Sequence, residues 1–155
     1  MKRSFPNLFV IGAPKCGTTS LYYYLGQHRD VYVPTTKEPF YYNADLYCDP
    51  SVCIRDREAY LDLFSGALNE KVLLDASVGY LYSREAPKRI AEDSPNAKFV
   101  VVLRNPTTMI HSLHWQCLHS LNEEYDDIED ALNLEAEREE GREIPIYSHF
   151  PMTLR

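Results

Sequence analysis

The feature that most constrains this chain is a glycine-bounded turn near its amino terminus, residues 12–19, with the sequence GAPKCGTT. The apolar run 8–11 precedes it, and a short apolar run that ends in glycine is typical of a buried parallel strand. After the turn, Leu21 and Leu25 lie four residues apart, as on one face of a helix. A strand, a tight turn and a helix in this order predict the start of a parallel α/β fold.

The rest of the chain repeats this alternation. The apolar runs 72–74 and 99–103 predict two more buried strands. Helical patterns are expected over residues 18–25, 57–64, 85–92, 107–121 and 128–142. Strands that alternate with helices predict a P-loop-type three-layer α/β/α fold with a central parallel sheet. At 155 residues, the chain is expected to be a single domain, residues 1–155.

Composition excludes several classes of protein. A formal net charge of −7 argues against a nucleic-acid-binding surface. No apolar run approaches the roughly 20 residues that span a bilayer, so a cytoplasmic protein without a membrane span is expected. Cys48 and Cys53 could pair locally, but free thiols are expected in a reducing cytosol. Without a Cys-x-x-Cys pair or matched histidines, no metal site is expected.

The turn at residues 12–19 is suited to bind a phosphate. Backbone N–H groups at a helix start lack partners, and the helix dipole adds a partial positive charge. Lys15 supplies a full charge, and the hydroxyls of Thr18 and Thr19 can donate hydrogen bonds. The Gly-x-x-x-x-Gly spacing matches a Walker loop, but Thr18 stands where that loop has lysine. The alternative is a purely structural turn.

A second junction of this kind follows the apolar run 99–103. Arg104 stands at the expected strand end, Pro106 suits the first helical turn, and Ser112 lies eight residues after Arg104. Ligands bind at the carboxyl ends of parallel strands, where a guanidinium can grip a phosphate with two hydrogen bonds. The alternatives are a surface ion pair for Arg104 and a hydrogen bond from Ser112 to its own helix backbone.

Residues 11–21 resemble the 5′-phosphosulfate loop of sulfotransferases that use 3′-phosphoadenosine 5′-phosphosulfate (PAPS). The resemblance is closest to the bacterial and heparan-sulfate types. It implies that Lys15 contacts the phosphosulfate and stabilises the leaving phosphate. The residues implied around the 5′-phosphate are Cys16, Gly17, Thr18, Thr19 and Ser20.

Two further segments resemble this family. Arg104 and Ser112 match the 3′-phosphate motif, although Met109 stands where many members have a second arginine. Residues 37–42 resemble the Lys-Glu-Pro segment of the heparan-sulfate type, which implies Glu38 as general base and Lys37 as a helper beside the sulfuryl group.

Each assignment in the Lys-Glu-Pro segment has an alternative. Lys37 and Glu38 could be an ordinary solvated ion pair. The base could instead be a histidine, as in sulfotransferases that modify small phenols and steroids. The available histidines are His28, His111, His114 and His119.

Residues 74–80 stand where the heparan-sulfate type has a lysine-containing segment that ends in tyrosine. The lysine is absent here, while Ser77 and Tyr80 are candidates to line the acceptor cleft. An apolar run followed by Asp75 also imitates the strand that holds magnesium in P-loop kinases and NTPases. A kinase or NTPase therefore stays open as an alternative.

The resemblance implies a PAPS-dependent sulfotransferase that uses no metal and acts on a hydroxyl or amine of a carbohydrate or small molecule. Residues 143–152 resemble the segment before the family's C-terminal helices, so the usual C-terminal part is expected to be missing and the activity of this chain alone to be low. A non-catalytic remnant is a third possibility. The sequence leaves the oligomeric state open.

Overall fold

The structure is a computed structural model that describes residues 4–46, 48 and 50–139. These fall into two compact units, Met1–Leu103 and Arg104–Arg155, and each is described by itself. The segment 143–152, which resembles the approach to a C-terminal region, lies outside the described residues. Within the described part of the chain, no helix has the length and apolar character to cross a membrane.

The first unit is built on a parallel sheet of four strands in the order β2-β3-β1-β4. These strands are β1 (Leu8–Gly12), β2 (Val31–Tyr32), β3 (Val72–Asp75) and β4 (Lys98–Val101). Phe9 of β1 is opposite Asp75 on one side and Phe99 on the other. Strand β1 is therefore central, and the turn that follows it leaves from the carboxyl edge of the sheet, where α/β folds bind ligands.

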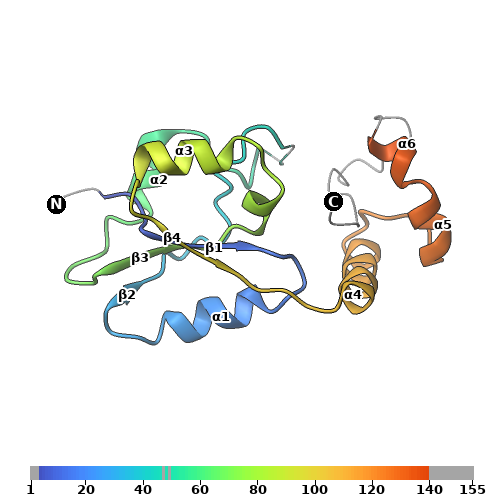
Figure 1. The fold of residues 1–155 in the computed structure, drawn as a ribbon, viewed down its shortest axis with the longest axis horizontal. Helices are drawn as coiled ribbons and strands as arrows, with labels where there is room; N and C mark the ends of the chain where they lie inside the picture. The colour runs from blue at the N-terminus through green and yellow to red at the C-terminus, as the bar shows by residue number, and fades with distance from the viewer. Residues whose placement is uncertain (1–3, 47, 49, 140–155) are drawn as a thin grey trace. The chain divides into compact units, whose positions relative to one another are not determined.

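Helices cover both faces of this sheet (Figure 1). Helix α1 (Thr18–Leu25) lies on one face, while α2 (Arg57–Asp62) and α3 (Ala86–Asp93) lie on the other. Adjacent residues of β1 point to opposite faces, so Val10 packs in a cluster with Tyr22 of α1, and Phe9 in a cluster with Tyr60 of α2. The expected three-layer α/β/α fold with a central parallel sheet is confirmed.

The second unit contains α4 (Pro106–His119), α5 (Ile128–Asn133) and α6 (Glu135–Glu139). Its interior holds a two-pronged ion pair, with Arg138 Nη1 at 2.7 Å from Glu123 Oε2 and Nη2 at 2.8 Å from Oε1. The same carboxylate accepts the backbone N–H groups of Glu124 and Tyr125. Burial would raise the pKa of Glu123, but Arg138 and the backbone N–H donors together outweigh it and lower the pKa.

Sequence patterns located the long elements well, and the differences have physical reasons. The predicted helix 128–142 is wrong as one helix, because the chain breaks at Leu134 into α5 and α6; residues 140–142 lie outside the described range. Strand β2 was missed because its two residues are too few for an alternating pattern. The short 3₁₀ helix η1 (Val78–Leu81) was also missed.

Candidate active site: the phosphate loop and the Glu38 segment

The phosphate loop, residues 12–18, joins β1 to α1 and is shaped by two glycines. Gly12 has φ +149°, and a Cβ there would come within 3.0 Å of the Leu81 side chain. Gly17 is the N-cap of α1 and has φ +84°, in the left-handed region that favours glycine. The loop is tied to the chain after β4, because Ala13 N–H donates to the Val102 carbonyl and Val102 N–H donates to the Gly12 carbonyl, both at 2.8 Å.

The end of this loop presents hydrogen-bond donors. Gly17 has no side chain to cap α1, so the first N–H groups of the helix have no intrahelical acceptor and no side-chain cap. Thr19 and Ser20 are exposed in the first turn, while Thr18 is buried. Lys15 adds a cation from within the loop, at φ +59°. This arrangement is suited to hold an anionic group such as a phosphate.

Arg104 and Ser112 belong to the second unit. Arg104 is exposed and immediately precedes Asn105, whose side chain caps α4 by accepting the Thr108 N–H at 3.4 Å. Ser112 is half-buried in α4. Met109, at the position where many sulfotransferases have a second arginine, is only 2% exposed and serves the packing of this unit.

The segment of residues 37–43, here called the Glu38 segment, has an unusual backbone. Glu38 and Phe40 have φ values of +59° and +53°, which non-glycine residues rarely adopt. Lys37 and Glu38 form an ion pair, and their side chains are 20% and 27% exposed. Such strained positions persist only where the surrounding structure holds them, and they concentrate at functional sites.

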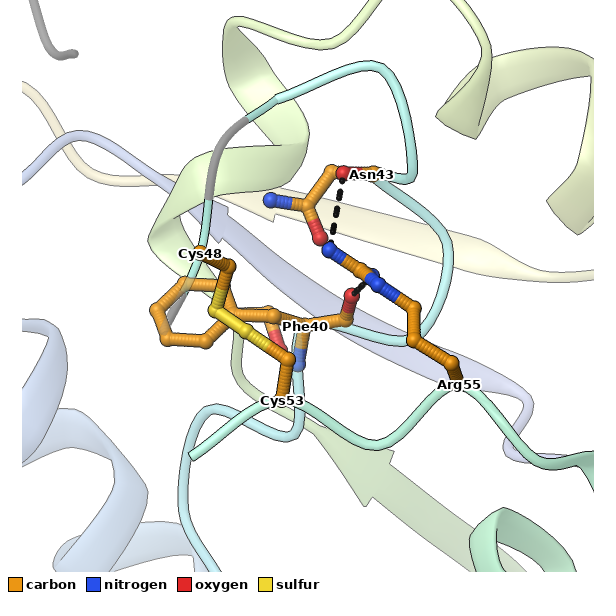
Figure 2. Close-up of a disulfide and its surroundings, with 6 residues drawn as sticks. Phe40, Asn43, Cys48, Cys53 and Arg55 are labelled. Atoms are coloured by element: carbon orange, nitrogen blue, oxygen red, sulfur yellow. Dashed lines mark hydrogen bonds between the residues drawn. A yellow bond between two sulfur atoms is a disulfide. The ribbon is translucent and has the colours of Figure 1, made fainter. Parts of the chain in front are cut away.

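Two neighbours from the following loop hold the Glu38 segment. Ile54 N–H donates to the Pro39 carbonyl at 2.9 Å. The Arg55 guanidinium donates to the carbonyls of Phe40 and Asn43, and Figure 2 shows it pointing at both. Partial burial, together with nearby Arg89, lowers the pKa of Arg55.

A third clamp comes from α3. Arg89 Nη1 donates to the carbonyls of Tyr41 and Tyr42 at 3.1 and 3.0 Å. Its guanidinium also lies 5.1 Å from the centre of the Tyr41 ring, within range of a cation–π contact. Two arginines from different parts of the chain therefore fix the backbone of one segment.

Cys48 and Cys53 form a disulfide in the loop that ends just before Arg55 (Figure 2). The expectation of free thiols is wrong for this pair, because the loop brings the two Cα atoms to 6.1 Å, within the usual range for a disulfide. Cys16 and Cys117 are free.

Asp75, the residue that suggested a magnesium-binding strand, is fully buried and accepts three hydroxyls. The Tyr60, Tyr80 and Ser77 hydroxyls donate to it at 2.7, 2.8 and 2.7 Å. Burial raises the pKa of Asp75, and these donors act against that rise. Because the Asp75 carboxylate already accepts these three hydrogen bonds, it does not support the kinase or NTPase alternative. Among the described residues, no group of three His, Cys, Asp or Glu side chains could hold a metal ion.

The side chains of Ser77, Tyr80 and two of the histidines have hydrogen-bond partners within the fold. Ser77 and Tyr80 are only 0% and 2% exposed, and both hydroxyls donate to Asp75 inside the fold, so neither hydroxyl is available to an acceptor. His114 is buried with Nε2 at 2.8 Å from the Tyr125 carbonyl oxygen, and His28 Nδ1 accepts the Asp30 N–H. These two histidines have structural roles, while His111 and His119 are exposed on α4.

The stretch 75–82 brings the phosphate loop and the Glu38 segment together within the first unit. Leu81 lies against Gly12, and burial beside Cys16 raises the pKa of Tyr82 to about 12. On the other side, Ser77 accepts the Phe40 N–H at 3.3 Å. Sequence reasoning missed Ser77, Arg55 and Arg89 as supports of this site, because their partners are backbone groups 12 to 48 residues away.

Comparisons with known proteins find similar sequences and structures. The family described as the sulfotransferase domain matches residues 5–150. Human heparan sulfate glucosamine 3-O-sulfotransferase 6 is 32% identical over 117 residues, which is 76% of this chain and 32% of the relative. The bifunctional heparan sulfate N-deacetylase/N-sulfotransferase 1 of Xenopus laevis is 32% identical over 115 residues, 70% of this chain and 12% of the relative.

Among solved structures, the sulfotransferase of Alicyclobacillus acidocaldarius matches with a TM-score of 0.85 at 31% sequence identity. The match covers 96% of this chain and 64% of that one. The chain thus spans a third or less of the two heparan sulfate enzymes and just under two thirds of the bacterial protein.

Proposed function

The chain belongs to the sulfotransferase family, and from this premise we propose that it transfers the sulfuryl group of PAPS to a carbohydrate hydroxyl or amine. The observation that carries the proposal is the phosphate loop. It combines Lys15 with an uncapped helix N-terminus at the carboxyl end of the central strand.

Donor binding is assigned to two groups of residues. The phosphate loop holds the 5′-phosphosulfate through Lys15 and through the residues around it, which are Cys16, Gly17, Thr18, Thr19 and Ser20. Arg104 and Ser112 hold the 3′-phosphate, the guanidinium through two hydrogen bonds and the serine through its hydroxyl.

In the transfer itself, Glu38 removes the proton of the acceptor hydroxyl or amine while the acceptor atom attacks sulfur. The bond between sulfur and the 5′-phosphate oxygen breaks, and adenosine 3′,5′-bisphosphate leaves. Lys15 neutralises the charge that develops on the leaving phosphate, and Lys37 lies beside the sulfuryl group. No metal takes part in this scheme.

The acceptor class comes from the relatives. The two named above act on heparan sulfate, by 3-O-sulfation and by N-sulfation. We assign this chain a carbohydrate acceptor of the same general chemistry.

Binding of the product tests donor recognition independently of any acceptor. Isothermal titration with adenosine 3′,5′-bisphosphate should show binding that needs no Mg²⁺ and that weakens roughly tenfold in Lys15→Ala, through the loss of one charge-assisted contact. Arg104→Ala should weaken it by a similar factor. Lys88→Ala is the control, because this α3 lysine is exposed and far along the chain from both motifs. Equal binding of adenosine 5′-monophosphate would refute the 3′-phosphate assignment.

Turnover then tests the reaction. Radiolabelled PAPS is incubated with heparan sulfate, N-deacetylated heparan sulfate and a small phenol, and label transfer is counted. Transfer to either polysaccharide supports the proposal, and transfer only to the phenol refutes the carbohydrate assignment. Binding of the bisphosphate without transfer to any acceptor, even in a chain extended to the length of its relatives, would identify a non-catalytic nucleotide-binding protein.

A further inference from the structure

Asp75, at the carboxyl end of β3, divides its two carboxylate oxygens between different partners. Oδ2 accepts the hydroxyls of Tyr60 and Tyr80, at 2.7 and 2.8 Å. Oδ1 accepts only the Ser77 hydroxyl among the hydrogen bonds of the described residues, at 2.7 Å. Asp75 and Ser77 are both fully buried, so water does not compete for these bonds.

The bond to Asp75 sets the direction of the Ser77 hydroxyl. A serine hydroxyl has one hydrogen, and here that hydrogen points at Asp75 Oδ1. The lone pairs of Ser77 Oγ are therefore left to accept, and they receive the backbone N–H of Phe40 at 3.3 Å. Asp75 thus makes Ser77 an acceptor toward the segment that carries Glu38.

The Glu38 segment needs such an anchor. Positive φ is unfavourable for non-glycine residues because the Cβ atom then crowds the backbone, and Glu38 and Phe40 are both in that region. The Arg55 and Arg89 clamps hold carbonyls of residues 40–43, on the far side of Phe40 from Glu38. Ser77 instead holds the Phe40 N–H, on the Glu38 side, and ties it to the chain just after β3; Ile54 N–H holds the Pro39 carbonyl of the same peptide group.

We propose that Ser77 is a positioning residue for Glu38, and that Asp75 holds the Ser77 hydroxyl in the orientation this requires. Ser77 does not touch the acceptor or the donor; it acts on the reaction through the backbone between Phe40 and Glu38. This inference rests on the proposed role of Glu38 as the base.

The first test compares two variants, each of which removes one hydrogen bond to the Asp75 carboxylate. Ser77→Ala removes the acceptor for the Phe40 N–H, and Tyr60→Phe removes one Oδ2 donor while it keeps the aromatic ring. Both lower the thermal midpoint. With PAPS and heparan sulfate as substrates, Ser77→Ala should lower kcat roughly 100-fold, as expected when a catalytic group is displaced by about 1 Å. The acceptor KM and the affinity for adenosine 3′,5′-bisphosphate should stay the same.

Tyr60→Phe should keep the wild-type kcat, and Ser77→Thr, which retains the hydroxyl, should restore most of it. A purely structural role would make the two destabilised variants equal in kcat. Equal kcat values in Ser77→Ala and Tyr60→Phe, or no recovery in a folded Ser77→Thr, overturn the proposal.

Asp75→Asn is a second variant that leaves Ser77 intact. Its amide NH₂ group should take the Oδ1 side, because that side faces one hydroxyl donor and the Oδ2 side faces two. The amide then donates to Ser77 Oγ and turns the serine hydrogen toward the Phe40 N–H. The expected result is a loss of kcat similar to that of Ser77→Ala, and wild-type kcat in Asp75→Asn contradicts the proposal.

Hydrogen exchange separates this inference from the proposed function. The Phe40 amide should exchange about tenfold faster in Ser77→Ala than in wild type, as expected for the loss of one hydrogen bond, and at the wild-type rate in Tyr60→Phe. If wild type fails to bind the bisphosphate or transfer sulfate, the proposed function falls, and the exchange rates still decide whether Ser77 holds the segment. If the Phe40 amide exchanges at the wild-type rate in Ser77→Ala, the proposed positioning role of Ser77 is wrong, whatever the activity of the variant.

Discussion

The phosphate loop and the Glu38 segment both use positive φ angles, but they are held in opposite ways. The loop has glycine at two of its three positive-φ positions and Lys15 at the third, and backbone hydrogen bonds with Val102 hold it. The Glu38 segment strains two non-glycine residues and is held by side chains from a distant loop, a helix and a strand end. Glycine therefore relieves much of the strain in the loop, whereas the segment is held mainly by side chains from distant residues.

The largest expected effect separates binding from catalysis at the two sites. Glu38→Gln should lower kcat by about 10²–10⁴-fold, the usual contribution of a general base, with unchanged affinity for adenosine 3′,5′-bisphosphate. Lys15→Met should lower both kcat and that affinity, because Lys15 contacts the part of the donor that becomes the product. Steady-state kinetics and isothermal titration measure the two quantities, with Lys88→Met as the matched lysine control. The comparison fails if Glu38→Gln weakens bisphosphate binding as much as Lys15→Met.

The disulfide should matter to the segment and not to the loop. Replacing Cys48 and Cys53 together by serine should lower the free energy of unfolding by about 2 kcal/mol, as expected for a short closed loop. Urea unfolding measures this, and bisphosphate affinity should be unchanged. Cys117→Ser, which alters a free thiol, is the control. Four titratable thiols in unfolded, unreduced protein would show that the bond is absent.

Gly17 should reveal how strongly the loop depends on its own backbone. A Cβ at this position meets no atom within 4 Å, so Gly17→Ala introduces strain without a clash. The expected loss is about 1–2 kcal/mol of unfolding free energy. Gly17→Asn should lose less, because asparagine tolerates the left-handed region better. An equal loss in both variants, by urea unfolding, would mean that the conformation is not the cause.

The smallest effect concerns acid sensitivity beside the Glu38 segment. Burial alone would raise the pKa of Asp45, but hydrogen bonds from Ser83 Oγ and the Arg84 N–H lower it below its ordinary value of 3.8. A lowered pKa in the folded state stabilises the fold above the ordinary value, and this contribution disappears as pH falls through the folded-state pKa. Asp45→Asn should therefore flatten the pH dependence of the thermal midpoint below about pH 4. A slope identical to wild type there argues against this role.

Much of the fold could be predicted from the sequence because its signals are local. The apolar run before Gly12 and the spacing of Leu21 and Leu25 located β1 and α1, with α1 at the predicted residues. The same kind of pattern gave β3, β4 and most of the helices. A two-residue strand such as β2 carries no such period, and the break at Leu134 occurs without glycine or proline to mark it.

In the candidate site, too, some features depend on neighbouring residues and others on tertiary contacts. The sequence by itself determined the glycine turn with its cation, because backbone conformation and helix starts depend on neighbouring residues. Only the tertiary structure decided that Asp75 is occupied by three hydroxyls, that Ser77 faces inward, and that two arginines hold the backbone of the Glu38 segment. These contacts join residues that are distant along the chain, so no local period or spacing encodes them.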